Sequence, residues 1–215
     1  MNGFTILLGG DLTPTPRLAA QVAGTRVIAA DSGIRHAAAL GVLPELWVGD
    51  FDSAGAALES AYAGVPREAY PPGKDKTDGE LAIDAALTRG AQRFVIAGAF
   101  GGPRADHGHL TMALSVKMAE EGQDVLLTSG AQEGIPLLPG TSRFDYAPGT
   151  VFSVLAFDAL SGLSISGARW PLVSVEVPFG SSLTISNETT GQLTIDLARG
   201  RALLLAHPHP DRDRF

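Results

Sequence analysis

The stretch LWVGDFDS at residues 46–53 decides the fold class of this chain. An apolar run ends there in two carboxylates separated by one residue, which is typical of a buried strand whose carboxyl end opens onto a polar site. Residues two apart in an extended segment face the same side, so Asp50 and Asp52 could both bind one hard cation such as Mg²⁺. An acidic turn closed by an Asx hydrogen bond is the alternative that the stretch alone leaves open.

The first 130 residues alternate short apolar runs with helical patterns on both sides of this stretch. The runs at residues 4–8, 27–30, 46–48, 65–70, 93–97 and 124–128 predict strands, and segments of helical composition separate most of them. Ser32 is placed to cap the second of these helices. This alternation predicts an α/β fold whose N-terminal part is a mostly parallel sheet with flanking helices.

The pattern changes after residue 128, where long helical periods stop. Six short apolar runs follow between residues 151 and 206, separated by glycine and proline. Such spacing indicates a C-terminal antiparallel β-sandwich. Glycine and proline accumulate between residues 130 and 140, so we expect two domains, 1–135 and 136–215.

Composition excludes several classes of function. The 215 residues carry a net charge of −7 and no cysteine, which argues against nucleic-acid binding and excludes disulfides and thiolate zinc sites. No apolar run approaches the roughly 18 residues of a membrane span, and no basic leader precedes the first strand, so we expect a cytoplasmic protein that binds no membrane. A phosphate ligand would have to arrive with its own cation.

The loop KDKTDGE at residues 74–80 is the most densely charged segment. Thr77 and Glu80 have the spacing of a capping box for the helix that follows, and Asp78 suits the helix dipole. That structural interpretation does not account for Asp75 between Lys74 and Lys76. A mixed site, where acids hold a metal and cations meet phosphate oxygens, is the functional interpretation.

Two further strand ends carry candidate ligand-binding residues. Asp31 ends its strand as Asp50 ends the next, so both carboxylates could lie at one edge of the sheet. The loop GAFGGPRADH at residues 98–107 has glycines that let a ligand approach the backbone, before a helix expected over residues 108–121. Its spacing is neither that of a P-loop nor that of a dinucleotide fingerprint. His107 suits a helix-start hydrogen bond as well as it suits catalysis.

Five segments together carry a resemblance to a known family. AADSG at 29–33, GDFDS at 49–53, KDKTDGELAI at 74–83, GAFGGPRADH at 98–107 and ISNE at 185–188 occur in an order and spacing similar to those of thiamine pyrophosphokinase, also called thiamine diphosphokinase. The resemblance spans nearly the whole chain. One departure is Pro103, which stands between the paired glycines and Arg104 where the family pattern has arginine directly after the glycines.

The resemblance implies an enzyme that moves the β,γ-pyrophosphoryl group of ATP onto the hydroxyl of thiamine, giving thiamine diphosphate and AMP. It also implies a homodimer with the active site between subunits, a catalytic nucleotide-binding domain and a thiamine-binding sandwich. By matching positions, the residues that hold Mg²⁺ or orient the reacting groups are Asp50, Asp52, Asp75, Asp78 and Asp106, with Asp50, Asp52 and Asp78 as metal ligands. The ATP-binding candidates are Asp31, Lys74, Arg104 and His107. The thiamine-binding candidates are Thr184, Ser186 and Asn187.

Several choices stay open on the sequence alone. Asp78 and Asp106 are equal candidates to accept the proton of the alcohol. Trp170 or Phe179 could offer an aromatic face to the cationic thiazolium ring, although we expect Trp170 in the core. The acceptor could be another heteroaromatic alcohol, such as a hydroxymethyl pterin, or the chain could be a sensor that binds without turnover. A phosphatase of the haloacid dehalogenase type is disfavoured, because its carboxylate pair should follow the first strand, where only Asp11 stands.

Overall fold

The chain folds into two compact units, each described here by itself. The structure, a computed structural model, describes residues 2–51, 55–71, 73 and 75–208. The first unit comprises Met1–His109 with Gly122–Gly130, and the second comprises Leu110–Glu121 with Ala131–Phe215. In the described residues no helix is both long enough and apolar enough to cross a membrane.

The first unit is built on a parallel sheet, as the sequence predicts. Its strands are ordered β6-β5-β1-β2-β3-β4, and every neighbouring pair is parallel. They span β1 (Gly3–Leu7), β2 (Arg26–Ala30), β3 (Leu46–Gly49), β4 (Arg67–Ala69), β5 (Arg93–Ala97) and β6 (Asp124–Thr128). The chain places β2 to β4 on one side of β1 and β5 and β6 on the other. The order of strands therefore reverses between β1 and β5, the point where ligands collect in open α/β sheets.

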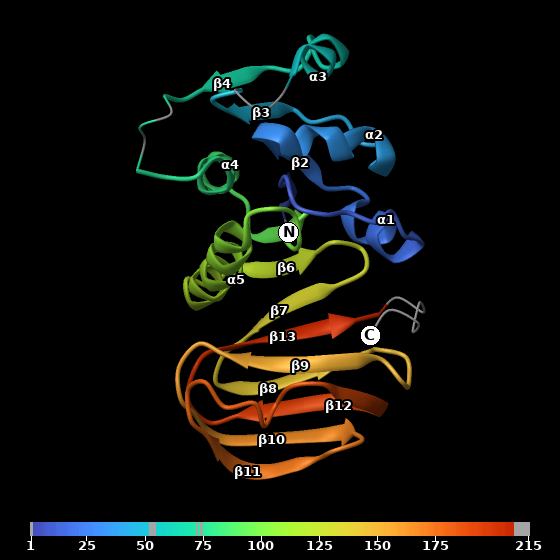
Figure 1. The fold of residues 1–215 in the computed structure, drawn as a ribbon, viewed down its shortest axis with the longest axis vertical. Coiled ribbons are helices and arrows are strands. Elements are labelled where there is room, and N and C mark those ends of the chain that lie inside the picture. The colour runs from blue at the N-terminus through green and yellow to red at the C-terminus, as the bar shows by residue number, and fades with distance from the viewer. Residues whose placement is uncertain (1, 52–54, 72, 74, 209–215) are drawn as a thin grey trace. The chain divides into compact units, whose positions relative to one another are not determined.

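Helices flank both sides of this sheet (Figure 1). They are α1 (Pro16–Val22), the 3₁₀ helix η1 (Asp31–His36), α2 (Ala37–Leu40), α3 (Gly55–Ala61) and α4 (Asp78–Thr88). Helix α5 (Ala105–Glu120) begins in this unit, and its residues from Leu110 onward belong to the second unit. Ile34 and Ala37 pack with Trp47 and Ala29 in one buried cluster, whereas α4 packs against β1, β2 and β3. Strands β1, β3 and β5 are buried on both faces, which explains why they read as continuous apolar runs.

The second unit contains the antiparallel sandwich expected from the sequence. Its strands are β7 (Glu133–Leu137), β8 (Gly140–Phe144), β9 (Val151–Ala156), β10 (Leu160–Ala168), β11 (Leu172–Val177), β12 (Asn187–Leu197) and β13 (Ala202–His207). One sheet contains β7, β13 and β9, and the other contains β8, β12, β10 and β11. The first two residues of β12 also pair with β9, so this strand joins the two sheets.

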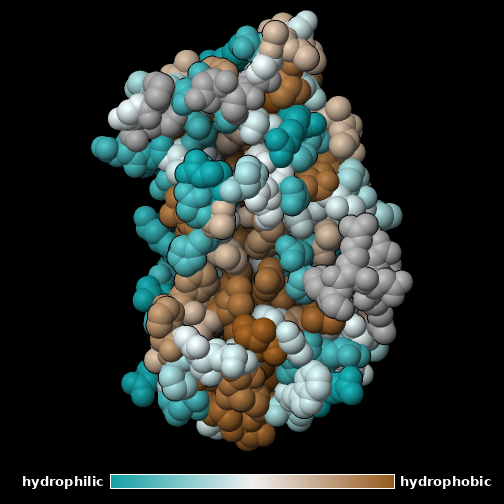
Figure 2. Space-filling view, viewed as in Figure 1, coloured by the Kyte–Doolittle hydropathy of each residue, from teal (hydrophilic) through white to brown (hydrophobic). Residues whose placement is uncertain are grey.

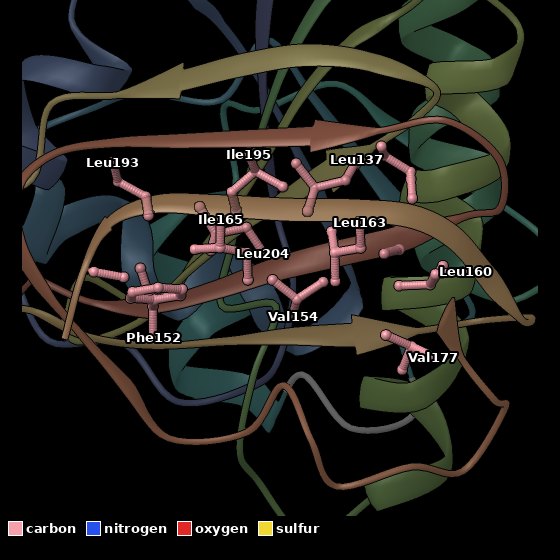
Figure 3. Packing of buried hydrophobic residues seen from close by; sticks show 14 of the residues in the cluster. Leu137, Phe152, Val154, Leu160, Leu163, Ile165, Val177, Leu193, Ile195 and Leu204 are labelled. Atoms are coloured by element: carbon pink, nitrogen blue, oxygen red, sulfur yellow. The ribbon is translucent and has the colours of Figure 1, made fainter. Parts of the chain in front are cut away.

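The core of the second unit lies between these sheets. Phe152, Val154 and Leu204 from the first sheet pack with Leu163 and Ile195 from the second, and all five are at most 1% exposed. Figure 3 shows these side chains pointing toward one another from facing strands. Alternation of inward and outward residues along each strand produces this core without helices.

Candidate active site

The ends of β2 and β3 are in contact at the carboxyl edge of the parallel sheet. The indole Nε1 of Trp47 donates a 2.9 Å hydrogen bond to the carbonyl oxygen of Asp31. A Cβ atom at Gly49 would lie 3.3 Å from both Cα and Cβ of Asp31, so only glycine allows this close approach without displacement. Asp50 follows directly, and the two aspartates therefore lie at one edge, as the sequence predicts.

The segment after Asp50 is anchored by aromatic contacts. Phe51 has φ 63°, and its ring packs edge-on against Trp47 with 5.0 Å between centroids. The guanidinium of Arg67 on β4 lies 4.6 Å from the Trp47 ring centroid and 5.4 Å from that of Phe51. These contacts fix the direction of the chain as it leaves β3. Asp52 lies outside the described residues, as does Lys74.

The N-terminus of α4 is held by the capping box expected from the sequence. Thr77 Oγ1 accepts from the Glu80 amide at 3.2 Å, and Glu80 Oε2 accepts from the Thr77 amide at 2.9 Å. Asp78 is the first residue of α4. A Cβ at Gly79 would lie 3.1 Å from Leu8 Cδ2, so this helix end lies beside the residue that follows β1. Asp78 is thus at the same edge as the two strand ends.

Two other charged residues of this loop, Lys76 and Asp75, have different surroundings. Lys76 pairs with Asp84 on α4, and this interaction raises the pKa of the lysine. Asp75 is exposed in the loop that precedes Thr77. Of the mixed set of acids and bases, the structure therefore places Asp78 at the strand edge and directs Lys76 along the helix.

The loops after β1 and β5 pack backbone against backbone. Gly10 and Asp11 donate amide hydrogen bonds to the carbonyls of Gly98 and Phe100, at 3.0 and 2.8 Å. A Cβ at Gly10 would lie 2.4 Å from the Gly98 oxygen, and one at Gly98 would lie 2.3 Å from the Leu8 oxygen. Glycine is required at both positions, and the loops are locked together where the strand order reverses.

Arg104 and Asp106 form a bidentate ion pair at the N-terminus of α5. Arg104 Nε and Nη2 donate to the two carboxylate oxygens of Asp106 at 2.9 and 2.6 Å. This hydrogen bonding, together with the charge of Arg104, holds the pKa of Asp106 far below its usual range. His107 is exposed in the same helical turn, and α5 begins at Ala105 rather than at 108. Asp106 is therefore strongly biased toward the ionised form.

The charge requirements of a divalent cation are only partly met by the described residues. In residues 2–51, 55–71, 73 and 75–208, no group of three His, Asp or Glu side chains is close enough to hold a metal ion. Asp50 and Asp78 nevertheless offer carboxylate oxygens at the same sheet edge, and such oxygens suit a hard cation. The expected third ligand, Asp52, is the one outside the described residues.

Two of the three thiamine-binding candidates use their side chains within the sandwich. Thr184 is 4% exposed, and its hydroxyl donates to the Val154 carbonyl at 2.7 Å. Asn187 Nδ2 donates to the Trp170 carbonyl at 2.8 Å, and Asn187 Oδ1 accepts from the Trp170 amide at 3.1 Å. Ser186 is exposed, with φ 62°. The expectation that Trp170 lies in the core is wrong, because its ring is 54% exposed.

Sequence reasoning missed two basic residues on η1. Arg35 Nη2 donates to the carbonyls of Gly9 and Gly10, at 2.5 and 3.2 Å. His36 Nε2 lies 2.9 Å from the Gly10 oxygen, and its burial lowers the pKa of the imidazole. The only signal in the sequence was a basic pair directly after the strand-end segment AADSG.

Comparisons with known proteins agree with this arrangement. A family model described as "Thiamin pyrophosphokinase, catalytic domain" matches residues 21–127, and one described as "Thiamin pyrophosphokinase, vitamin B1 binding domain" matches residues 142–201. The thiamine pyrophosphokinase of Bacillus subtilis is 27% identical over 95% of this chain and 98% of its own length.

Solved structures show the same fold. The crystal structure of thiamine pyrophosphokinase from Bacillus subtilis superposes with a TM-score of 0.83 at 26% identity, covering 96% of this chain and 99% of that one. The enzyme from Geobacillus thermodenitrificans gives 0.81 at 26% identity, covering 97% and 99%. With both family models matched in order and a relative of similar length throughout, the chain belongs to the thiamin pyrophosphokinase family of enzymes.

Proposed function

We propose that the chain is a Mg²⁺-dependent thiamine diphosphokinase. The hydroxyethyl oxygen of thiamine attacks Pβ of ATP, the bond between Pβ and the α,β-bridging oxygen breaks, and AMP leaves with that oxygen. Thiamine diphosphate is the other product, and the alcohol proton passes to a base. The observation that carries the proposal is the contact between the ends of β2 and β3, which brings Asp31 and Asp50 to one edge of the sheet.

The acids at this edge would hold the metal. Asp50, Asp52 and Asp78 are the proposed ligands, and bound Mg²⁺ supplies the positive charge that neutralises triphosphate oxygens. Asp75 would help to orient the reacting groups. Asp31, Lys74, Arg104 and His107 are the residues that we assign to ATP. Their work is mainly positioning and electrostatic stabilisation, which dominate phosphoryl transfer.

Asp106 is a poor candidate for the proton acceptor. The ion pair with Arg104 lowers the pKa of Asp106, and a carboxylate with a lower pKa is a weaker base. Asp78 stands at the first position of α4, beside the end of β1. In this scheme Asp106 would orient Arg104 toward the nucleotide rather than take the proton.

The second domain, residues 136–215, would supply the thiamine site. Ser186 is exposed directly before β12 and could contact the substrate directly. Asn187 and Thr184 would act by holding the chain in place, since their side chains bond to Trp170 and Val154. The exposed ring of Trp170 offers an aromatic face that suits a cationic thiazolium.

A homodimer with the active site between subunits is the proposed assembly. Apolar side chains are exposed on β11 and in the chain segments directly before and after it, and Figure 2 shows brown surface over the lower strands of the sandwich. They are Trp170, Val173, Phe179, Leu183 and Ile185, which are 45–83% exposed. Exposed apolar patches mark interaction sites, so these side chains are the candidates for the subunit contact. A cytoplasmic location belongs to the same proposal and would be checked by cell fractionation.

The decisive experiment is an AMP-release assay on the purified chain with MgATP and thiamine. We expect AMP and thiamine diphosphate in equal amounts, and neither product without thiamine. A hydroxymethyl pterin as competing acceptor tests the alternative substrate. If thiamine raises the melting temperature but no AMP forms, the chain is a sensor and the proposed reaction is wrong.

A further inference from the structure

Most basic side chains of the first unit are already engaged by acids. Arg26 and Arg89 contact Glu45, and further ion pairs join basic and acidic residues along the surface. These pairs are Arg67 with Glu59, Lys76 with Asp84, Arg93 with Asp124, and Arg104 with Asp106. Few basic side chains of the first unit are therefore available to bind a triphosphate.

Arg35 differs from these residues. Its guanidinium donates through Nη2 to two neutral carbonyl oxygens, those of Gly9 and Gly10, and it makes no ion pair with any acid in the part of the chain that the structure describes. Carbonyl oxygens fix the group without cancelling its charge. The side chain is exposed, so Nε and Nη1 remain able to donate to a ligand.

Arg35 lies near the carboxyl edge of the parallel sheet, where ligands collect in open α/β folds. It lies in the last turn of η1, which starts at Asp31 at the carboxyl end of β2, and it contacts the loop that follows β1. His36 beside it contacts the same loop, but burial lowers the pKa of His36, so the histidine is neutral near pH 7. The positive charge at this corner of the sheet edge comes from Arg35.

We propose that Arg35 binds a phosphate group of the nucleotide, an assignment that rests on the proposed function. A guanidinium that is held in place by two carbonyls loses less conformational freedom when it binds, and its hydrogen bonds to phosphate are charge-assisted. Arg35 thereby supplies part of the positive charge that the triphosphate needs.

The test compares Arg35→Gln, Arg35→Lys and the matched control Arg143→Gln. Arg143 is an exposed arginine on β8 that makes no ion pair within the described residues. For each variant, calorimetry measures the Kd of a non-hydrolysable ATP analogue with Mg²⁺, scanning calorimetry measures Tm, and the AMP-release assay measures the KM of thiamine.

We expect Arg35→Gln to weaken binding of the analogue by about tenfold or more, as loss of charge-assisted hydrogen bonds does. The Tm and the KM of thiamine should stay unchanged, Arg35→Lys should recover part of the affinity, and the control should bind as the wild type does. An unchanged Kd in Arg35→Gln overturns the assignment. So does a fall in Tm with equal loss in Arg35→Lys, since that result means Arg35 only braces the glycine loop.

The outcome is separable from that of the proposed function. If the wild type binds the analogue but forms no thiamine diphosphate, the proposed reaction is wrong. The Kd values of the wild type and the Arg35 variants still test whether Arg35 binds phosphate. If the wild type turns over and Arg35→Gln binds equally well, the assignment of Arg35 fails alone.

Discussion

Trp47 and Asp31 are joined by a hydrogen bond from the indole Nε1 to the backbone carbonyl, 2.9 Å long. The bond connects the buried indole ring of Trp47 on β3 to the residue directly after β2, and Asp31 has φ 43° there. The buried side chain of Trp47 thus fixes the backbone position of Asp31, a candidate ATP-binding residue. The site and the core of the first unit are therefore coupled through one indole.

Trp47→Phe should lower both stability and nucleotide affinity. The change leaves the Asp31 carbonyl without this donor and opens space in the core, a loss of about 2–4 kcal/mol in the free energy of unfolding. Thermal and chemical denaturation measure the stability, and the KM of ATP reports the site. The matched change Trp170→Phe, at an exposed ring, should leave Tm nearly unchanged. Equal Tm values for both variants would contradict the coupling.

Asp52→Ala should abolish turnover and leave the fold intact. A ligand to the metal contributes chiefly repulsion when the metal is absent, so we expect a loss of about 10²–10³-fold in kcat with Tm unchanged. Asp124→Asn serves as the control, because Asp124 is an exposed acid at the start of β6 that only pairs with Arg93. Near-normal AMP release by Asp52→Ala would show that the metal assignment is wrong.

Gly98→Ala should be much more destabilising than Gly24→Ala. Both glycines have positive φ, 74° and 73°, but a Cβ at Gly98 would lie 2.3 Å from the Leu8 oxygen, whereas Gly24 has open space. The common backbone strain costs about 1 kcal/mol, and the collision adds to it only at Gly98. The two melting temperatures measure this difference directly. If they fall equally, the two loops do not pack as tightly as described.

Stability should fall as the pH drops from 7 to 5, partly because of His36. Burial lowers the pKa of His36 in the folded state, so the unfolded chain takes up a proton first, at about pH 6.5. The stability that this group contributes is complete above that pH and is lost as the pH falls toward the folded pKa. His36→Gln should flatten the plot of Tm against pH. His207 has a pKa lowered by burial as well, so His207→Gln removes a separate share.

Asn187→Ala should raise the KM of thiamine and leave the KM of ATP unchanged. The amide of Asn187 bonds both the N–H and the carbonyl of Trp170, and its loss frees the Trp170 segment to move. Leaving these part-buried groups unpaired costs about 1–3 kcal/mol. Thr190→Ala, at an exposed position of β12, is the control. A parallel rise in both KM values would mean that the sandwich does not form the thiamine site.

Residues at strand ends and helix starts could be predicted from the sequence. Asp31 and Asp50 follow apolar runs, and the carboxyl ends of parallel strands share one edge, so pattern alone places them together. Thr77 and Glu80 were predicted equally well, because a capping box depends only on local spacing. These features need no knowledge of distant contacts.

Residues whose environment depends on tertiary contacts could not be predicted. Ser32 does not cap a helix, because η1 already begins at Asp31 and Ser32 lies inside it. Tryptophan is a residue type that often lies in a core, yet the ring of Trp170 is exposed to solvent. Arg35 gained its contacts because the loop after β1 folds back on η1, and the pairing of Arg104 with Asp106 depends on rotamers at the start of α5. The pattern of apolar and polar residues in the sequence does not determine such tertiary contacts or rotamers.

The strand β12 acts as a seam in the second unit. Asn187 and Glu188 belong to one layer, and the later residues of the same strand belong to the other. Separating the layers therefore requires breaking a single continuous strand out of both, which makes their opening one cooperative event. A small molecule bound against Ser186, just before β12, would slow amide exchange in both β9 and β10. Binding at this one position would therefore stabilise both sheets of the sandwich.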